Sequence, residues 1–259
     1  MTSAELKARM NYSIVITTFD KRFDAYLIPL IRSIKQHRPE VEIVVTANGP
    51  CKAVFDPNYR TRLLEFLATQ SNSFPTVFPT FQSLAKMWNR GVLTATQEQV
   101  LVLNDDLIIQ SSNGKSFFDQ LETVLAGNSG TFKINGSFSH YVISKAELIE
   151  VGFFDERLLG LGEEDGDFYW RYHEKFKKEI ASVDLGGIEN VCSDLADDGY
   201  VKGIRTAAKF NRDFIKNVKY REVLLGGHRG MFDKRVKKQL PDEAQYPYEQ
   251  FARLHSGEV

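Results

Sequence analysis

The sequence is poor in cysteine and in long apolar runs. Its 259 residues include only two cysteines, Cys51 and Cys192, which are too few for a disulfide framework and predict a reducing compartment. The first apolar run lies at residues 12–16, too short and too late for the core of a secretory signal. No apolar stretch approaches the ~20 residues that span a bilayer. We therefore expect a cytoplasmic protein without a transmembrane segment.

Net charge is also nearly absent. The chain carries 33 basic and 34 acidic residues and a formal charge of -1. Domains that bind nucleic acid are usually strongly basic, so we expect no nucleic-acid partner. One local basic run comprises Lys234, Arg235, Lys237 and Lys238. It indicates a solvated helix face or, as the alternative, a peripheral contact with anionic lipid at the inner face of the membrane.

Several catalytic motifs are missing. The turn at residues 17–22 has no glycine, which disfavours a dinucleotide-binding loop and a P-loop. There is no G-x-S-x-G and no H-E-x-x-H sequence. Five scattered histidines and two cysteines give no zinc-ligand spacing. Dehydrogenases, P-loop enzymes, serine hydrolases and zinc hydrolases are therefore disfavoured.

The chain does contain alternating strand-like and helix-like segments. We predict strands at residues 12–18, 41–46, 76–78, 100–103, 137–143 and 180–183, and helices at 23–37, 59–69, 81–96, 115–126, 146–151, 164–176 and 199–215. This order predicts an α/β fold, Rossmann-like, with a mostly parallel central sheet flanked by helices. Such sheets bind ligands at the carboxyl ends of their strands. The polar residues 17–20, 48–49 and 104–106 should converge there.

Two acidic clusters carry the chemistry. Asn104, Asp105 and Asp106 follow a predicted strand, and their hard oxygen ligands suit Mg²⁺ or Mn²⁺. The alternative is a simple turn, which Asn and Asp also favour. The second cluster, residues 163–167, has four carboxylates at the start of a predicted helix. They complement the helix dipole, but their mutual repulsion also makes one of them a candidate general base.

Three ordered blocks resemble family-two glycosyltransferases. In residues 78–109, a helix ending in Asn89-Arg90-Gly91 leads to a strand and a D-x-D-like Asn104-Asp105-Asp106. In residues 136–175, a small-residue strand leads to a Gly-Phe-Asp-Glu-like loop at residues 152–157, then to Glu164-Asp165-Gly166-Asp167 and Arg171. The first strand, ending in Thr17-Thr18-Phe19, completes a resemblance that spans roughly residues 12–220.

This resemblance implies a GT-A fold and a metal-dependent, inverting sugar transfer. The domain would cover residues 1–225, with a nucleotide-sugar half at about 10–110 and an acceptor half at 111–225, and residues 226–259 would form a tail or lid. A nucleotide-diphosphate sugar would be the donor, Mn²⁺ or Mg²⁺ the cofactor, and a glycan or lipid-linked molecule the acceptor. The setting implied is bacterial surface polysaccharide or lipopolysaccharide synthesis.

The resemblance also assigns site residues. Asp165 would be the catalytic base, and Asp106, with His228 as a second candidate, would hold the metal. Donor-binding residues would be Thr17, Thr18, Phe19, Asn48, Lys86, Asn104 and Asp105, and substrate-binding residues would be Trp88, Asp155 and Glu164. Alternatives remain for four of them: a core position for Trp88, a plain loop position for His228, a loop-capping role for Asp155 and a solvated surface position for Lys86.

The chain departs from the family pattern in three places. Residues 46–49 lack the aspartate that often contacts the nucleobase, the first D-x-D position is asparagine, and no histidine follows soon after residue 180. Other classes stay open: a non-catalytic glycan- or nucleotide-binding module, or a scaffold subunit of a larger synthase. A nucleotidyltransferase is disfavoured, because residues 17–22 lack its glycine-rich loop.

Overall fold

The protein is built on one large, mixed sheet. A computed structural model describes residues 12–49, 55–112, 114–191, 207–222 and 237–239. Seven strands lie in the order β10-β8-β9-β4-β1-β2-β3. Their bounds are β1 (Tyr12–Phe19), β2 (Glu42–Asn48), β3 (Ser73–Val77), β4 (Gln99–Asn104), β8 (Phe132–Ile134), β9 (Ser137–Ser144) and β10 (Ala181–Val183). The four strands β1 to β4 run parallel, as predicted, and β9 runs antiparallel to both β4 and β8.

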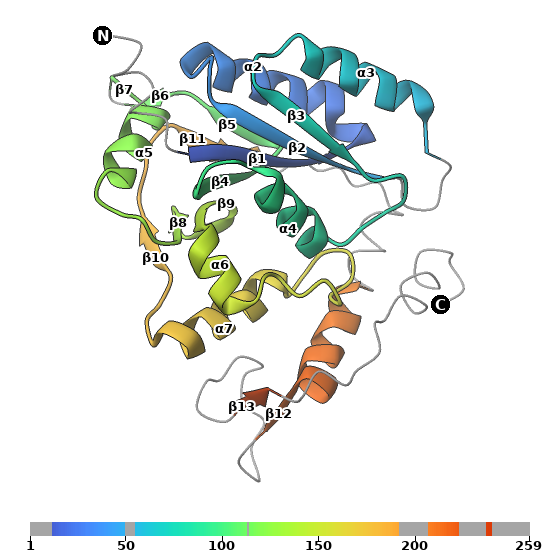
Figure 1. The fold of residues 1–259 in the computed structure, drawn as a ribbon, viewed down its shortest axis with the longest axis vertical. Coiled ribbons are helices and arrows are strands. Elements are labelled where there is room, and N and C mark those ends of the chain that lie inside the picture. The colour runs from blue at the N-terminus through green and yellow to red at the C-terminus, as the bar shows by residue number, and fades with distance from the viewer. Residues whose placement is uncertain (1–11, 50–54, 113, 192–206, 223–236, 240–259) are drawn as a thin grey trace.

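The central strands are buried on both faces, which explains their composition. Every residue of β2 and all but the last residue of β1 are buried. Strands covered on both sides form continuous apolar, β-branched runs instead of alternating patterns. The run Ile14, Val15 and Ile16, with no exposed surface, is an example. The sheet is therefore the middle layer of a three-layer sandwich (Figure 1).

Helices cover the two faces of the sheet through two separate apolar cores. One core receives residues from α2 (Ile28–His37), α3 (Pro57–Ala68) and α5 (Phe117–Leu125). The other core receives residues from α4 (Leu84–Thr94), α6 (Lys145–Val151) and α7 (Glu164–Phe176). Figure 1 shows α2 and α3 on one side of the sheet and α4, α6 and α7 on the other. The fold class predicted from the sequence is confirmed.

Local chemistry sets the helix boundaries. The hydroxyl of Ser83 accepts a hydrogen bond from the Lys86 amide, so α4 begins at Leu84 instead of residue 81. Before α2, the chain forms the 3-10 turn η1 (Asp20–Arg22) and the π-helix η2 (Phe23–Leu27). Pro29 lies in the first turn of α2 and has no amide hydrogen to donate, which accounts for the wider turn that precedes it.

The Asn-x-Gly motif has a packing reason. A Cβ atom added to Gly91 would lie 2.4 Å from Cγ1 of Val15, so only glycine lets α4 approach β1 this closely. Asn89, two residues earlier, donates to the Phe154 carbonyl at 2.8 Å and accepts from its amide at 3.0 Å. The motif thus fixes α4 against both the sheet and the loop that precedes α7.

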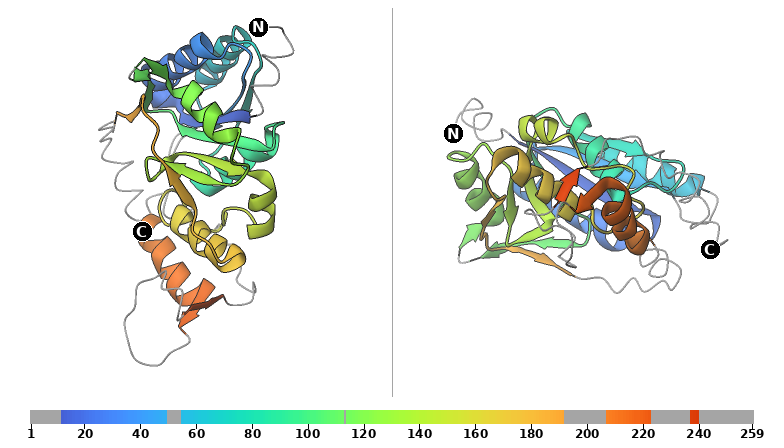
Figure 2. Two further views of the ribbon diagram at one scale, coloured as in Figure 1. Left: turned by 90° about the vertical axis from the view of Figure 1, so that its left-hand side faces the viewer. Right: turned by 90° about the horizontal axis from the view of Figure 1, so that it is seen from below.

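The sequence patterns did not predict three small pairs of strands. β5 (Leu107–Ile109) pairs with β11 (Ile188–Asn190), β6 (Ser111–Ser112) pairs with β7 (Lys115–Ser116), and β12 (Tyr220–Glu222) pairs with β13 (Lys237–Gln239). Before β12, residues 207–214 are helical and continue into η3 (Ile215–Lys219). This C-terminal helix, residues 207–219, lies beside α7 at the end of the molecule away from α2 and α3 (Figures 1 and 2). Most of the predicted tail, residues 226–259, lies outside the described residues, and β13 is its described part.

None of the helices among the described residues is long and apolar enough to span a membrane.

Candidate functional site

The carboxyl ends of the parallel strands bring the predicted donor residues together. Thr17 is in register with Asn104 on β4, and Phe19 is in register with Asn48 on β2. Thr18, between them on β1, is buried. These three segments therefore share one edge of the sheet, as the polar clusters predicted.

Asn48 has a structural task at this edge. Its side-chain oxygen accepts a hydrogen bond from the Gln82 amide at 2.7 Å, and its side-chain nitrogen donates to the Gln82 carbonyl at 2.9 Å. Both polar groups of the amide thus hold the segment that leads into α4. A contact between Asn48 and a nucleobase stays a prediction, and this arrangement does not favour it.

The first acidic cluster is buried and faces an arginine. The side chains of Asp105 and Asp106 are 2% and 9% exposed, and Nη1 of Arg22 lies 2.6 Å and 3.1 Å from their oxygens. Burial raises the pKa of Asp105 to about 6, although the charge and hydrogen bonds of Arg22 oppose the shift. The carboxylate pair is thus already in contact with one cation, the guanidinium of Arg22.

The acidic pair suits a divalent metal only in part. Oδ2 of Asp105 and Oδ1 of Asp106 are buried and have no hydrogen-bond partner, so each carboxylate keeps one oxygen for a ligand. No group of three or more His, Cys, Asp or Glu side chains able to hold a metal occurs among the described residues. His228 lies outside them. A metal at this pair would take its remaining ligands from water or phosphate, as Mg²⁺ usually does.

The second acidic cluster begins α7 and divides into three environments. Asp165 is partly exposed, and within the described part of the chain its Oδ1 accepts a local hydrogen bond from the Gly166 amide at 2.8 Å. Glu164 is buried and accepts from the Gly162 amide at 2.6 Å. Asp167 has no exposed surface. Glu163 is partly exposed but pairs with Arg212 at 3.1 Å, so Asp165 is the carboxylate of this cluster that best combines access with freedom from a cation among the described residues.

Hydrogen bonds link the end of β2 to the loop that precedes α7. Gln82, held by Asn48 of β2, lies two residues before Leu84, whose amide donates to the Gly160 carbonyl at 2.8 Å. Gly160 belongs to the loop that ends at α7. Tyr141 of β9 is close to the same helix start: burial, followed by the charges of Asp165 and Glu164, raises the pKa of its hydroxyl. The β2 end of the sheet edge is thus linked by hydrogen bonds to the loop that precedes α7, and that loop leads to the second acidic cluster.

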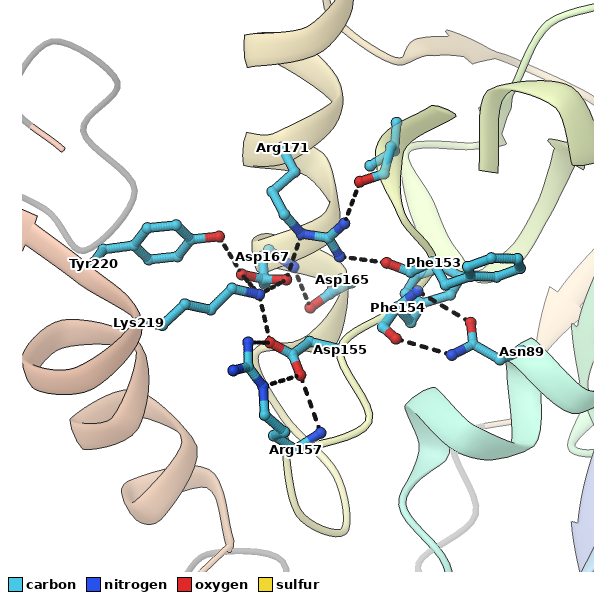
Figure 3. Close-up of polar contacts among 12 residues, drawn as sticks. Asn89, Phe153, Phe154, Asp155, Arg157, Asp165, Asp167, Arg171, Lys219 and Tyr220 are labelled. Atoms are coloured by element: carbon cyan, nitrogen blue, oxygen red, sulfur yellow. Dashed lines mark hydrogen bonds and ion pairs between the residues drawn. The ribbon is translucent and has the colours of Figure 1, made fainter. Parts of the chain in front are cut away.

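A buried ionic network lies behind the start of α7 (Figure 3). Nζ of Lys219 is 2.5 Å from Asp155 and 2.9 Å from Asp167. Asp167 also accepts from Nε of Arg171 at 2.9 Å and from the Tyr220 hydroxyl at 2.6 Å. The predicted substrate residue Asp155 is engaged as well. Its other partner is Arg157, at 2.7 Å. Both carboxylates pair with cations and thereby fix the loop and the helix, and a substrate contact for Asp155 stays a prediction that this arrangement does not favour.

The C-terminal helix reinforces this loop with further contacts. Asn211, which has no exposed surface, accepts from the Leu159 amide at 2.6 Å and donates to the Leu159 and Gly162 carbonyls at 2.8 and 2.7 Å. A Cβ atom on Gly160 or Gly162 would lie 3.1 Å from Cβ of Ala207 or Ala208. Residues 207–220 therefore hold the segment between β9 and α7. The sequence predicted a helix here but gave no sign of these partners.

Two further predicted site residues lie on α4. Trp88 is 3% exposed and packs against Tyr141 and Phe154, with ring centroids 5.5 and 4.9 Å apart. This is the core position that the sequence allowed as an alternative for Trp88. A sugar contact for Trp88 stays a prediction that the arrangement does not favour. Lys86 is half-buried in the first turn of α4.

The buried Glu164 leads to a pH-dependent stability prediction. Burial raises its pKa from 4.5 to about 8. Between these values the folded protein keeps a proton that the unfolded chain has lost, so this group lowers stability as pH rises. Glu164→Gln, which cannot ionise, should gain stability relative to the wild type across that window, by roughly 1–4 kcal/mol in total.

Urea denaturation at pH values from 4 to 9 would measure this gain. Glu174→Gln is the matched control, because it makes the same change on the same helix at a side chain that is 36% exposed. Its stability difference from the wild type should stay flat with pH. If the stability difference between Glu164→Gln and the wild type also stays constant with pH, Glu164 ionises normally in the folded protein.

Comparisons with known proteins identify the fold. No protein-family model matches the chain. No curated protein matches it in sequence either. Solved structures do match. Glucosyl-3-phosphoglycerate synthase from Mycobacterium tuberculosis, in complex with Mn²⁺ and UDP-glucose, is similar over 93% of this chain and 91% of its own, with TM-score 0.53 and 16% identity.

Two other structures show the same likeness. The mannosyltransferase PcManGT from Pyrobaculum calidifontis, with GDP-mannose and Mn²⁺, matches 95% of this chain and 69% of its own, with TM-score 0.55 and 12% identity. S. aureus TarS 1–349 with UDP matches 80% of this chain and 73% of its own, with TM-score 0.52 and 16% identity. The chain spans 46% of a longer TarS structure. At these identities the likeness shows the fold alone: the chain has the GT-A fold that these structures share.

Proposed function

We propose that the protein is a GT-A glycosyltransferase that moves a sugar from a nucleotide-diphosphate donor to a hydroxyl group of a glycan or glycolipid acceptor, with inversion. The observation that carries this proposal is the acidic pair at the carboxyl end of β4, Asp105 and Asp106, with two buried oxygens that lack a partner among the described residues; the accessible Asp165 at the start of α7 supplies a candidate base. Similar folds have been solved with Mn²⁺ and nucleotide sugars, which supports the same ligand classes here.

Each group has a distinct task in this reaction. Asp165 accepts the proton of the acceptor hydroxyl as that oxygen attacks the anomeric carbon from the face opposite the leaving diphosphate. Asp106, assisted by Asp105, holds Mn²⁺ or Mg²⁺. Such an ion supplies Lewis-acid stabilisation of the charge on the leaving diphosphate. Thr17, Thr18 and Phe19 line the donor side. By family resemblance, the biological setting that we propose is bacterial surface polysaccharide synthesis.

The decisive test is metal-linked nucleotide binding. UDP and GDP should bind far more tightly in Mn²⁺ than in chelator, and Asp106→Ala should abolish that difference by removing a metal ligand. Isothermal titration calorimetry measures both affinities. Asp119→Ala is the control, because Asp119 is an exposed carboxylate on α5 that pairs with Arg38. Equal affinity with and without metal in the wild type would refute the metal role.

A further inference from the structure

Arg22 has an unusual position for a surface-loop arginine. It ends the turn η1 directly after β1, yet its side chain is only 15% exposed. One nitrogen, Nη1, contacts both carboxylates of the acidic pair, at 2.6 Å from Asp105 and 3.1 Å from Asp106. The guanidinium carbon lies 5.3 Å from the ring centre of Phe19 and 5.6 Å from that of Tyr26. Two aromatic faces and two carboxylates therefore hold a single cation at the edge where donors bind.

This arrangement neutralises the acidic pair only partly. Two adjacent, buried carboxylates repel each other, and one guanidinium supplies one positive charge against two negative ones. One oxygen of each carboxylate remains buried without a hydrogen-bond partner. The pair thus retains capacity for a second cation. However, any cation that enters must lie close to Arg22 and is repelled by it. The entering cation and the Arg22 guanidinium are stable side by side only if an anion lies between them.

We propose that Arg22 is a movable counter-ion, which neutralises the acidic pair in the free protein and turns to the donor diphosphate when a divalent metal takes its place. This inference rests on the proposed function and deepens it. A planar guanidinium binds phosphate oxygens in a forked geometry, so Arg22 exchanges one set of anionic partners for another. Metal and diphosphate then bind cooperatively: each relieves the repulsion that opposes the other.

The proposal assigns Arg22 two measurable effects with opposite signs. Arg22→Met removes the competing charge while keeping an apolar stem against Phe19 and Tyr26. Mn²⁺ alone should therefore bind the variant about tenfold more tightly than it binds the wild type. UDP should bind about tenfold more weakly in the presence of Mn²⁺, because a phosphate partner is lost. Uridine, which has no phosphate, should bind both proteins equally.

The experiment titrates Mn²⁺ by electron paramagnetic resonance and UDP and uridine by calorimetry, with GDP and guanosine as a second pair. Arg22→Lys keeps the positive charge but lacks the forked guanidinium. Relative to Arg22→Met, it should restore the weak Mn²⁺ affinity of the wild type but only part of the UDP affinity. Arg32→Met is the matched control, because Arg32 also lies over an aromatic ring, that of Phe66, at 6.0 Å. All its affinities should equal those of the wild type.

The results separate this proposal from the proposed function. A wild-type protein that binds neither nucleotide would refute the donor site itself, while the Mn²⁺ titration would still report on Arg22. If nucleotides bind but Arg22→Met leaves Mn²⁺ affinity unchanged, Arg22 does not compete with metal and the proposal is wrong. An equal loss of UDP and uridine affinity would also overturn it, since that pattern indicates local distortion instead of a lost phosphate contact.

Discussion

Replacing Asp165 by asparagine is expected to lower turnover by roughly 10²-fold or more while leaving the fold intact. Asparagine has nearly the same shape and can still accept the hydrogen bond that the Gly166 amide donates at 2.8 Å. It also suits the start of a helix. What it cannot do is remove a proton from an acceptor hydroxyl. The melting temperature and the affinity for UDP or GDP should therefore change little.

The structure narrows the alternatives to Asp165. Asp167 has no exposed surface and is bound by Arg171, Lys219 and Tyr220, so it has no freedom to take a proton from a substrate. Glu164 is buried, with its pKa raised to about 8 by burial, and is thus largely neutral at pH 7. A neutral carboxyl group is a poor base. Only Asp165 among these three is both accessible and unpaired by cations among the described contacts.

Because the acceptor is unknown, slow hydrolysis of nucleotide sugars in Mn²⁺ serves as the first assay, with water in place of the acceptor. UDP-glucose and GDP-mannose are suitable probes. Glu174→Gln on the same helix controls for the loss of a carboxylate, and it should keep most of the activity. An Asp165→Asn variant that hydrolyses donor at the wild-type rate would exclude Asp165 as the base.

Local patterns were sufficient to predict the parallel part of the sheet. The strands β1, β2 and β4 consist of continuous apolar runs, because both faces are covered, and polar residues follow each of them. For the edge strand β3, the sequence predicted a start at residue 76, whereas the strand begins at Ser73. Pro75 interrupts its pattern, and an edge strand tolerates a proline that a central strand would not.

The partners of the charged residues were not predictable in the same way. Arg22 meets Asp105 across 83 positions, and Lys219 meets Asp155 across 64. Periodicity reports which face of an element is apolar, but it carries no information about which distant charge lies opposite. The motif resemblance located the carboxylates. Only the three-dimensional arrangement shows that Asp155 and Asp167 are paired with Lys219, whereas Asp165 has no cationic partner among the described residues.

Lys219→Met should destabilise the protein by about 2–4 kcal/mol, because it removes a buried charge that bridges two carboxylates. Nζ of Lys219 is 2.5 Å from Asp155 and 2.9 Å from Asp167, and its side chain is 3% exposed. Arg157 and Arg171 still neutralise one carboxylate each. The two carboxylates, however, would then face each other without the shared cation. For a chain of this size the melting temperature should fall by about 5–15 °C.

The pH dependence of this loss identifies its cause. Burial alone would raise the pKa of Asp155, but hydrogen bonds from Arg157 and the charge of Lys219 hold it well below its usual range. A carboxylate whose pKa is depressed by folding stabilises the protein above its unfolded pKa, near 4, and this stabilisation is lost as pH falls. The difference between the wild type and Lys219→Met should therefore narrow below about pH 4.

Urea denaturation at pH 7 and pH 3 measures both effects, with Lys209→Met as the control on the exposed face of the same C-terminal helix. Lys219→Met combined with Asp155→Asn should recover part of the loss at pH 7, because the second change removes the repulsion between the carboxylates. A loss that is equal at both pH values and unaffected by the second change would show that Lys219 acts through the packing of its methylene groups. A stability within about 0.5 kcal/mol of the wild type would mean that the bridge contributes nothing.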